Sequence, residues 1–184
     1  AGESLIRQFL YGRRTSRDLL GYEGRVTWLP DVFGYPGNLP QIMAGCGMQY
    51  FVTSKINWND TTRFPYDLFL WEGIDGTAVP TSFIPDAAMG YNGVATPADN
   101  ALSWRRVRHK DVQRSFIKPI GEGDGGGGPR REDLELARRV ADLHGTPRLT
   151  WRRVGEALPD SFAAARNLPR WRGELYLEFH RGTY

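Results

Sequence analysis

The amino-acid sequence predicts an α/β fold with a mainly parallel sheet, and its segment order supports this class. Stretches with the hydrophobic pattern of strands alternate with stretches of helical periodicity, which is the order that parallel strands with crossover helices produce. The chain contains about four or five such strands, too few for a closed barrel of about 250 residues. It stops at Tyr184 directly after an expected strand, with no closing helix. We therefore expect a piece of a larger domain.

Four stretches have the apolar spacing of helices. In ESLIRQFLYGRR the apolar residues repeat at helical spacing, and Gly12 is expected to end the helix. In NLPQIMAGCG, Asn38 can cap a helix whose first turn accommodates Pro40. The stretch RREDLELARRVADLHG begins with acids and closes at Gly145, so it is the clearest helix. Residues 154–168 are expected to form the last helix.

Strands are expected where short apolar runs are bounded by turn residues. These runs are RVTWL, QYFVTS, DLFLWEG, a short strand around Val79, and GELYLEFH near the end of the chain. FIKPIG is expected to form a further short strand before the glycine run. Residues 85–103 are rich in Pro, Gly, Asn and Asp, a composition that predicts a long loop.

Composition excludes several classes of protein. The 184 residues suit one domain or part of one, and 40% of them are hydrophobic, enough for a packed core. Global disorder is therefore not expected. No apolar run is long enough to span a bilayer, and the first residues lack the pattern of a secretion signal. The single cysteine, Cys46, excludes an internal disulfide and is compatible with a reducing compartment.

The charge pattern does not indicate a nucleic-acid binder. The net charge is only +3, and the arginines are interleaved with Asp and Glu. SWRRVRHK, residues 103–110, is the one dense basic run, and we interpret it as a solvated face. Aromatic residues are numerous, with 6 Trp, 8 Tyr and 9 Phe, many beside Asp, Asn or Gly. Such neighbours suit sugar binding, although on composition alone a role in the core is the stronger interpretation.

Asp31 stands out in WLPDVFGYPGNLPQI. A hydrophobic run stops at Pro30 and a single carboxylate follows at once, among apolar neighbours that would make ionisation costly. A carboxylate at the end of a buried strand is typical of a site at the edge of a sheet.

The glycine run EGDGGGGPR, residues 122–130, precedes the clearest helix. A P-loop needs Lys and Ser or Thr after its last glycine, but Pro129 and Arg130 stand there. The strand before it is too poor for a dinucleotide fingerprint. Between a flexible linker and an ordered loop framed by Asp124 and Pro129, we favour the loop.

The final stretch, GELYLEFHRGTY, alternates between two faces. If it is a strand, Glu174, Tyr176, Glu178 and His180 share one face. This polar face fits either the rim inside a barrel or the solvated side of an edge strand. In FPYDLFLWEGIDGTAV, Asp75 and Gly76 form a common hairpin turn, so Asp75 alone has a simple structural explanation.

Taken in order, these motifs resemble the catalytic region of α-mannosidases of glycoside hydrolase family 38. The stretches that carry the resemblance are ESLIRQFLYG, WLPDVFGYPGNLPQI, SKINWNDTTRFPYDLFLWEGIDGTAV, GDGGGGP and GELYLEFHRGTY. They span nearly the whole chain and are most similar to bacterial and cytosolic-type members. The resemblance implies a segment of a seven-stranded (β/α) barrel, with residues 1–184 part of one catalytic domain, incomplete at both ends. It also implies a cytoplasmic location.

The resemblance implies hydrolysis of α-mannosidic bonds with retention of configuration. In this family the Asp of the PD-FG motif is the nucleophile and also a ligand of one divalent metal, usually Zn²⁺; here that residue is Asp31. The other ligands of the family lie in H-x-D and HD motifs that this chain lacks, and its own three histidines match neither motif. We therefore expect Asp31 to be the only metal ligand that the chain supplies.

Further site residues follow from the same resemblance. Glu178 is the candidate acid/base, with Glu174 in reserve. A retaining mechanism needs two carboxyl groups about 5–5.5 Å apart with opposite protonation states. A metal would favour the charged form of Asp31, and the neighbours of Glu178 could keep it protonated. The residues expected to line the sugar site are Trp58, Asn59, Trp71, Asp75, Asp124 and His180.

The expected partner is a mannose-containing oligosaccharide, without nucleic acid or membrane, and a homo-oligomer is left open. A second hypothesis is a non-catalytic carbohydrate-binding segment, which would keep the aromatic residues and need no metal. The third, a basic nucleic-acid binder, would require steeply salt-dependent binding.

Overall fold

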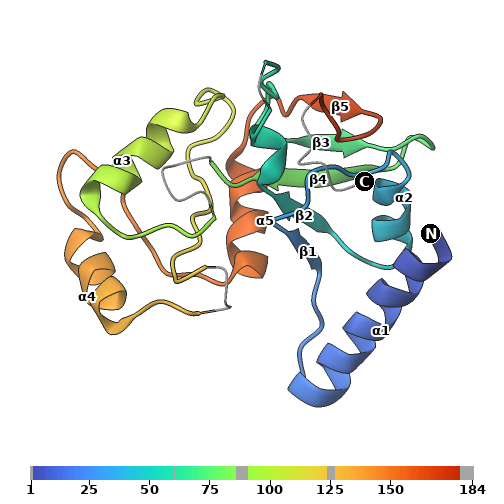
Figure 1. Ribbon diagram of the computed structural model, residues 1–184, viewed down its shortest axis with the longest axis horizontal. Helices are drawn as coiled ribbons and strands as arrows, with labels where there is room; N and C mark the ends of the chain where they lie inside the picture. Colours follow the sequence, from blue (N-terminus) through green and yellow to red (C-terminus); the bar gives the residue numbers. More distant parts are fainter. Residues whose placement is uncertain (1, 60, 86–90, 124–126, 179–184) are drawn as a thin grey trace.

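The computed structural model describes residues 2–59, 61–85, 91–123 and 127–178. Its centre is a five-stranded sheet in the order β1-β2-β4-β3-β5 (Figure 1). The strands are β1 (Val26–Leu29), β2 (Tyr50–Thr53), β3 (Leu68–Glu72), β4 (Ala78–Phe83) and β5 (Arg170–Arg172). Three of the strand pairings are parallel, and only β3 and β4 are antiparallel. The expected α/β class with a mainly parallel sheet is confirmed; closure into a seven-stranded barrel stays an expectation.

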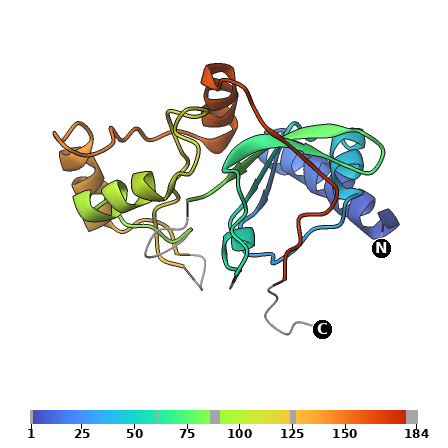
Figure 2. The same ribbon diagram turned by 90° about the horizontal axis from the view of Figure 1, so that it is seen from above.

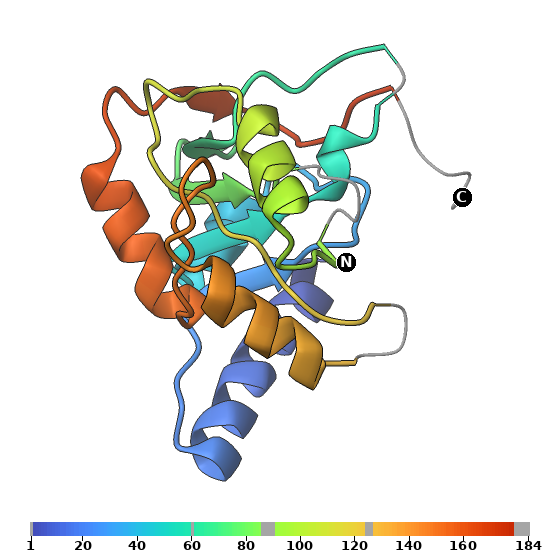
Figure 3. The same ribbon diagram turned by 90° about the vertical axis from the view of Figure 1, so that its left-hand side faces the viewer.

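The helices divide into two groups around this sheet. They are α1 (Gly2–Leu20), α2 (Leu39–Gly45), the 3-10 helix η1 (Lys55–Asn57), α3 (Pro97–Arg106), α4 (Arg131–Val140) and α5 (Val154–Ala164). Figures 1 and 2 both show α1 and α2 beside the sheet, with α3 and α4 in a separate lobe and α5 between the two. In Figure 3, seen from the side of that lobe, α3 and α4 lie in front of the sheet.

The two faces of the sheet bury different clusters of side chains. Phe51 of β2 belongs to the larger cluster, against which Phe9 of α1 and Met43 of α2 pack. Its neighbour Val52 points to the other face and packs against Leu158 of α5. This alternation is the period-two geometry of a strand, and it explains why QYFVTS reads as continuously apolar: both of its faces are covered.

The first helix is longer than expected. Gly12 does not end it, because α1 continues to Leu20 and Gly21 follows with a φ of 60°. A glycine inside a helix costs about 1 kcal/mol but does not stop it when helix-forming residues follow. The expectation for Gly12 is wrong, and the left-handed residue that ends the helix is Gly21.

Residues 85–103 are not one long loop, since α3 begins at Pro97. Its N-terminus has a standard cap, in which the Thr96 side chain accepts a hydrogen bond from the main-chain N–H of Asp99 at 3.2 Å. Pro97 occupies the first turn, where its missing N–H costs nothing. The stretch FIKPIG forms only an isolated bridge, between Ile120 and Gly93.

The expected strand GELYLEFH is wrong over its described part. The strand lies just before it, as β5, and Gly173 with a φ of 102° breaks the extended run. Beyond that glycine, Leu175 forms an isolated antiparallel bridge with Tyr35. Residues 179 and 180 lie outside the described part of the chain.

Candidate active site at the carboxyl edge of the sheet

Asp31 and Lys55 come together because of the register of two parallel strands. Leu29 at the end of β1 pairs with Thr53 at the end of β2. Asp31 and Lys55 each follow by two residues, so both leave the same edge of the sheet side by side. The carboxyl edge of parallel strands is where α/β proteins build their sites.

The two side chains form an ion pair. Lys55 Nζ lies 3.1 Å from Asp31 Oδ1, with the lysine side chain 8% exposed and that of Asp31 60% exposed. The expectation that apolar neighbours make ionisation of Asp31 costly is therefore wrong. Its carboxylate is exposed to solvent, and one of its oxygens is paired with the Lys55 ammonium. A buried ammonium must be compensated by partners, and here the carboxylate supplies the opposite charge.

Aromatic rings surround the Lys55 ammonium. Its Nζ lies 3.5 Å from the centroid of the Trp58 ring, 5.3 Å from that of Phe33 and 5.1 Å from that of Tyr91. Phe33 and Trp58 meet edge to face with their centroids 6.3 Å apart. These distances are those of cation–π contacts, which compensate part of the charge of a desolvated lysine. The site thus combines an exposed carboxylate, a fixed cation and aromatic side chains.

Tyr35 fastens the loop that carries Asp31. Its hydroxyl donates to the main-chain oxygen of Leu29 at 2.7 Å and lies 2.6 Å from Thr53 Oγ1, whose hydroxyl then donates to it. This one side chain therefore ties together the ends of β1 and β2. Burial raises the pKa of Tyr35 above its usual value, so the phenol stays a neutral donor.

The segment after Gly173 runs beside this loop. Tyr35 and Leu175 exchange two backbone hydrogen bonds, of 2.9 and 3.0 Å. Gly34 lies so close to Tyr176 that a β-carbon at this glycine would overlap the tyrosine ring. The structure thus brings two distant motifs of the sequence together, as the expectation of a shared site requires.

Glu178 does not have the surroundings expected for a protonated acid. It is exposed, and its Oε1 accepts hydrogen bonds from the main-chain N–H groups of Thr62 at 2.6 Å and Thr61 at 3.0 Å, and from the Thr61 hydroxyl at 2.7 Å. These bonds, first that from Thr62, lower the pKa of Glu178 to about 2. The expectation that its neighbours keep Glu178 protonated is wrong for this conformation, and its acid/base role stays a prediction.

The reserve residue and the proposed sugar contacts are spread over the molecule. Glu174 is exposed, and Trp171 Nε1 donates to its main-chain oxygen at 2.8 Å. Trp58 lies in the site, and Asn59 is half-buried nearby, its amide donating to the main-chain oxygen of Ile56. Asp124 and His180 lie outside the described residues.

Two of the expected sugar contacts are elsewhere. Trp71 is 0% exposed in the core, where its indole N–H donates to the main-chain oxygen of Gly173 at 2.7 Å. Asp75 lies in the turn between β3 and β4, at the amino end of β4 and therefore at the edge of the sheet opposite to Asp31. There its carboxylate accepts from the side chain and main chain of Thr77, which lowers its pKa. Both expectations are corrected for the conformation described.

The described residues do not by themselves hold a metal. Across residues 2–59, 61–85, 91–123 and 127–178, no three His, Cys, Asp or Glu side chains gather in one place. The Asp31 carboxylate is paired with the Lys55 ammonium. A zinc site at Asp31 would need ligands from other residues, so no chemical step is assigned to a metal here.

A large cavity lies away from this site. It has a volume of about 1080 Å³ and lies between the α3–α4 lobe and α5, with Trp28, Trp104, Phe116 and Trp151 among its lining residues. Neither Asp31 nor Lys55 lines it. We locate the site from the register of β1 and β2 and from the Asp31–Lys55 ion pair rather than from the volume of this cavity.

Sequence reasoning missed Lys55 and the rings of Phe33 and Tyr91. The signal for Lys55 was available, because it follows its strand by the same two residues as Asp31 follows the neighbouring strand. Tyr91 gave no such signal, since it is brought to the site from beyond β4 by the tertiary fold.

Comparison with known proteins identifies the family of the chain. Residues 1–174 match the description "Glycosyl hydrolases family 38 N-terminal domain". The chain belongs to glycosyl hydrolase family 38. The match agrees with the resemblance of the sequence motifs to this family.

Particular relatives cover the whole chain. It is 39% identical over 184 residues to Alpha-mannosidase G of Dictyostelium discoideum and 37% identical over 184 residues to Alpha-mannosidase 2C1 of Mus musculus. It spans 17% and 18% of their lengths. The fold is similar to a crystal structure of an alpha-mannosidase from Enterococcus faecalis, with a TM-score of 0.68, 18% identity, 95% of this chain covered and 20% of that one.

Among the described residues, no helix combines the length and the apolar character needed to cross a lipid bilayer.

Proposed function

We propose that this chain carries the nucleophile of a retaining α-mannosidase that removes terminal α-linked mannose from oligosaccharides. The observation that carries the proposal is the exposed Asp31 carboxylate, held by Lys55 at the carboxyl edge of a parallel sheet in a family 38 chain. Because the chain spans less than a fifth of the length of its curated relatives, the activity belongs to a larger polypeptide that contains it.

The geometry supports one role for each of the two charged groups. In the first step a carboxylate oxygen of Asp31 attacks the anomeric carbon, the glycosidic C–O bond breaks, and an acid protonates the leaving oxygen. Water then cleaves the mannosyl ester and restores the configuration. Lys55 holds Asp31 Oδ1 at 3.1 Å and so fixes the direction of the exposed carboxylate. Such fixed orientation is a large part of the advantage of an enzyme site.

The acid/base residue and the metal stay predictions. The resemblance assigns the first role to Glu178 or Glu174, but the hydrogen bonds from Thr61 and Thr62 keep Glu178 ionised in this conformation. A zinc ion would polarise sugar hydroxyls at the site when bound. Its other ligands would come from residues outside those described.

A non-catalytic carbohydrate-binding segment is the second candidate. The rings of Phe33, Trp58 and Tyr91 around one cation would suit it as well, since such a protein needs no nucleophile. Turnover separates the two functions, because a binding module does not cleave an aryl α-mannoside.

Replacement of Asp31 by Asn in the complete polypeptide tests the proposal. The variant keeps the shape of the side chain but loses the attacking charge, so hydrolysis of an aryl α-mannoside should fall by about 1000-fold or more. Asp142→Asn is the matched control, since Asp142 is an exposed carboxylate that pairs with Arg148, and this change should leave turnover unchanged. Turnover of the Asp31 variant close to that of the parent protein would refute the assigned role.

A further inference from the structure

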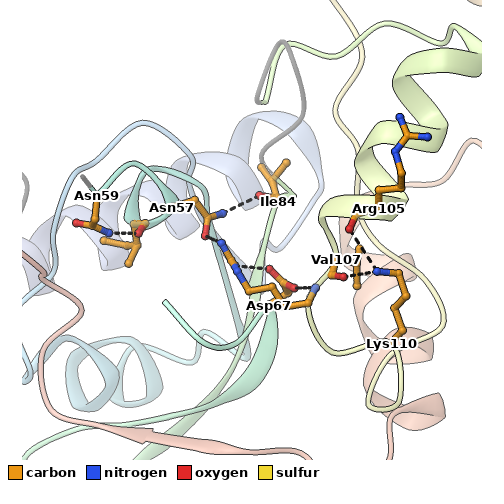
Figure 4. A network of polar contacts seen from close by, with 9 residues as sticks. Asn57, Asn59, Asp67, Ile84, Arg105, Val107 and Lys110 are labelled. Carbon is orange, nitrogen blue, oxygen red and sulfur yellow. Dashed lines mark hydrogen bonds and ion pairs between the residues drawn. The ribbon is translucent and has the colours of Figure 1, made fainter. Parts of the chain in front are cut away.

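Arg108 joins Asp67 and Asn57 in a polar network; Figure 4 labels these two partners. Its guanidinium Nη1 donates to Asp67 Oδ1 at 2.7 Å, and its main-chain N–H donates to Asp67 Oδ2 at 2.5 Å. Its Nη2 donates to Asn57 Oδ1 at 2.9 Å. One arginine thus binds a carboxylate and an amide at once, with the forked geometry that a lysine cannot reproduce. The interpretation of the basic run SWRRVRHK as a solvated face is therefore wrong at Arg108.

The network joins four segments that are far apart in the sequence. Asp67 directly precedes β3, Ile84 directly follows β4, Asn57 ends η1, and Arg108 follows α3. Asn57 Nδ2 donates to the main-chain oxygen of Ile84 at 3.2 Å, a bond visible between the labelled residues in Figure 4. The network therefore attaches η1 to the carboxyl edge of the sheet and to the lobe that contains α3.

Lys55 lies next to this attachment. It lies in the same three-residue helix as Asn57, and so short a 3-10 helix has little stability of its own. The backbone N–H of Asn57 donates to the main-chain oxygen of Ser54, and that of Trp58 donates to the main-chain oxygen of Lys55. Ile56 of the same helix is buried in the core, and the side chain of Asn57 adds polar contacts to Ile84 and Arg108. Lys55 Nζ lies 3.1 Å from Asp31 Oδ1.

Because Asp67 is buried, its carboxylate requires the ion pair with Arg108. Asp67 is 1% exposed, so its carboxylate needs compensating partners. Burial raises the pKa of Asp67, and the charge of Arg108 opposes that rise. Arg108 is therefore held in one orientation, and the arm that it extends to Asn57 has a fixed direction.

We propose that Arg108 is a positioning residue of the glycosidase site, which holds Asn57 and thereby keeps Lys55 against Asp31. The inference rests on the proposed function. In this role Arg108 affects turnover through the position of Lys55, whereas a purely stabilising residue would affect only the stability of the fold.

A double-mutant cycle between Asn57 and Lys55 in the complete polypeptide tests this inference. Asn57→Ala removes the arm to η1 but leaves the Arg108–Asp67 pair intact. We expect kcat on an aryl α-mannoside to fall about tenfold, with KM changed less than about twofold, because the fixed geometry matters most in the transition state. In the Lys55→Met background, Asn57→Ala should have almost no further effect on kcat.

The matched control is Asn100→Ala. Asn100 accepts a hydrogen bond from Lys118 at 2.8 Å, and Lys118 pairs with buried Asp99. The chemistry is similar, but Asn100 and Asp99 belong to α3 rather than to η1. This variant should leave kcat within about twofold of the parent protein. Arg108→Lys is the second test, because it keeps a charge for Asp67 but cannot also bind Asn57; it should reproduce the kcat loss of Asn57→Ala.

The outcomes separate the two claims. An Asp31→Asn variant that retains turnover overturns both the proposed function and this inference. If Asp31→Asn is inactive and Lys55→Met is impaired, yet Asn57→Ala lowers kcat by the same factor in both backgrounds, only the inference is overturned. If Asn57→Ala and Arg108→Lys both keep the kcat of the parent protein, the inference is likewise overturned and the proposed function is not. Thermal melting of every variant distinguishes loss of fold from loss of positioning.

Discussion

Asp31 owes its character to its place two residues after a strand. Its carboxylate is exposed, one oxygen is bound by Lys55 at 3.1 Å, and the loop that carries it is tied down by the hydroxyl of Tyr35. An exposed carboxylate with one oxygen already bound has a restricted orientation, which is what attack on a sugar carbon requires. Residue identity alone would not distinguish it from an ordinary surface aspartate.

Glu178 offers a test at the residue scale through pH. Its pKa is lowered from 4.5 to about 2, so the ionised side chain contributes stability at neutral pH. That contribution is complete above the unfolded-state pKa and is lost as the pH falls through the folded-state value. We expect Glu178→Gln to be less stable than the parent protein at pH 7, with the difference shrinking as the pH falls from about 4.5 towards 2, measured by chemical unfolding. A difference in stability that stays constant down to pH 2 would contradict this account.

Sequence reasoning located Asp31 but not its partners. A charged residue after a strand is visible in one dimension, whereas Lys55 becomes significant only when two strands are paired in register. Arg108 was hidden for a similar reason, because its run is basic and its buried partner, Asp67, lies 41 positions earlier. Trp71 shows the opposite error: its motif suggested a sugar contact, but the tertiary fold buries the ring completely.

Helix α1 provides a test at the scale of an element. Gly12 lies inside the helix, and a β-carbon there would meet nothing within 4 Å. Gly12→Ala should therefore stabilise the protein by about 1 kcal/mol, because alanine is the better helix former. Thermal and chemical unfolding of the variant measure this gain.

Gly21 is the matched control for Gly12. A β-carbon there also meets nothing within 4 Å, but its φ of 60° is unfavourable for alanine, so Gly21→Ala should destabilise the protein. If Gly12→Ala were the destabilising change of the two, the helix would end at Gly12 after all.

Elements with a strong local pattern were predicted, and those that depend on context were not. The strands at 26–29 and 50–53 and the start of the helix at Arg131 follow from patterns in the sequence. That helix ends at Val140, earlier than the expected Gly145. Helix α3 begins within a stretch whose composition is typical of a loop. The sequence signals for its start are the capping residue Thr96 and Pro97 in the first turn. GELYLEFH alternates like a strand, but over its described residues, 173–178, Gly173 interrupts the run after β5 and Leu175 forms an isolated bridge with Tyr35.

At the scale of the whole molecule, the chain combines a sheet with helices on both faces and a separate lobe that reaches the site through Arg108 (Figures 1 and 2). The TM-score of 0.68 to the Enterococcus faecalis structure, with 95% of this chain covered, shows that this arrangement is a shared fold. Closure of the barrel could not be inferred from the sequence, because about four or five strands do not determine how a sheet closes.

Zinc binding is a prediction for the whole molecule. The 184-residue chain alone should bind less than about 0.1 zinc per chain and show no turnover, because a catalytic zinc needs about three protein ligands. The complete polypeptide should carry about one zinc and lose activity when a chelator removes it. Metal analysis of both proteins after dialysis measures this, and stoichiometric zinc with full turnover in the isolated chain would refute the proposed division of the site.

The most direct test of the account is to identify the residue that becomes covalently attached to the sugar. The complete polypeptide would be incubated with a fluorinated mannosyl fluoride, which slows the second step, then digested and analysed by mass spectrometry. We predict a mannosyl adduct on the peptide that contains Asp31, and no adduct in Asp31→Asn. An adduct on another carboxylate, or an unchanged adduct in the variant, would contradict the assignment of Asp31 as the nucleophile.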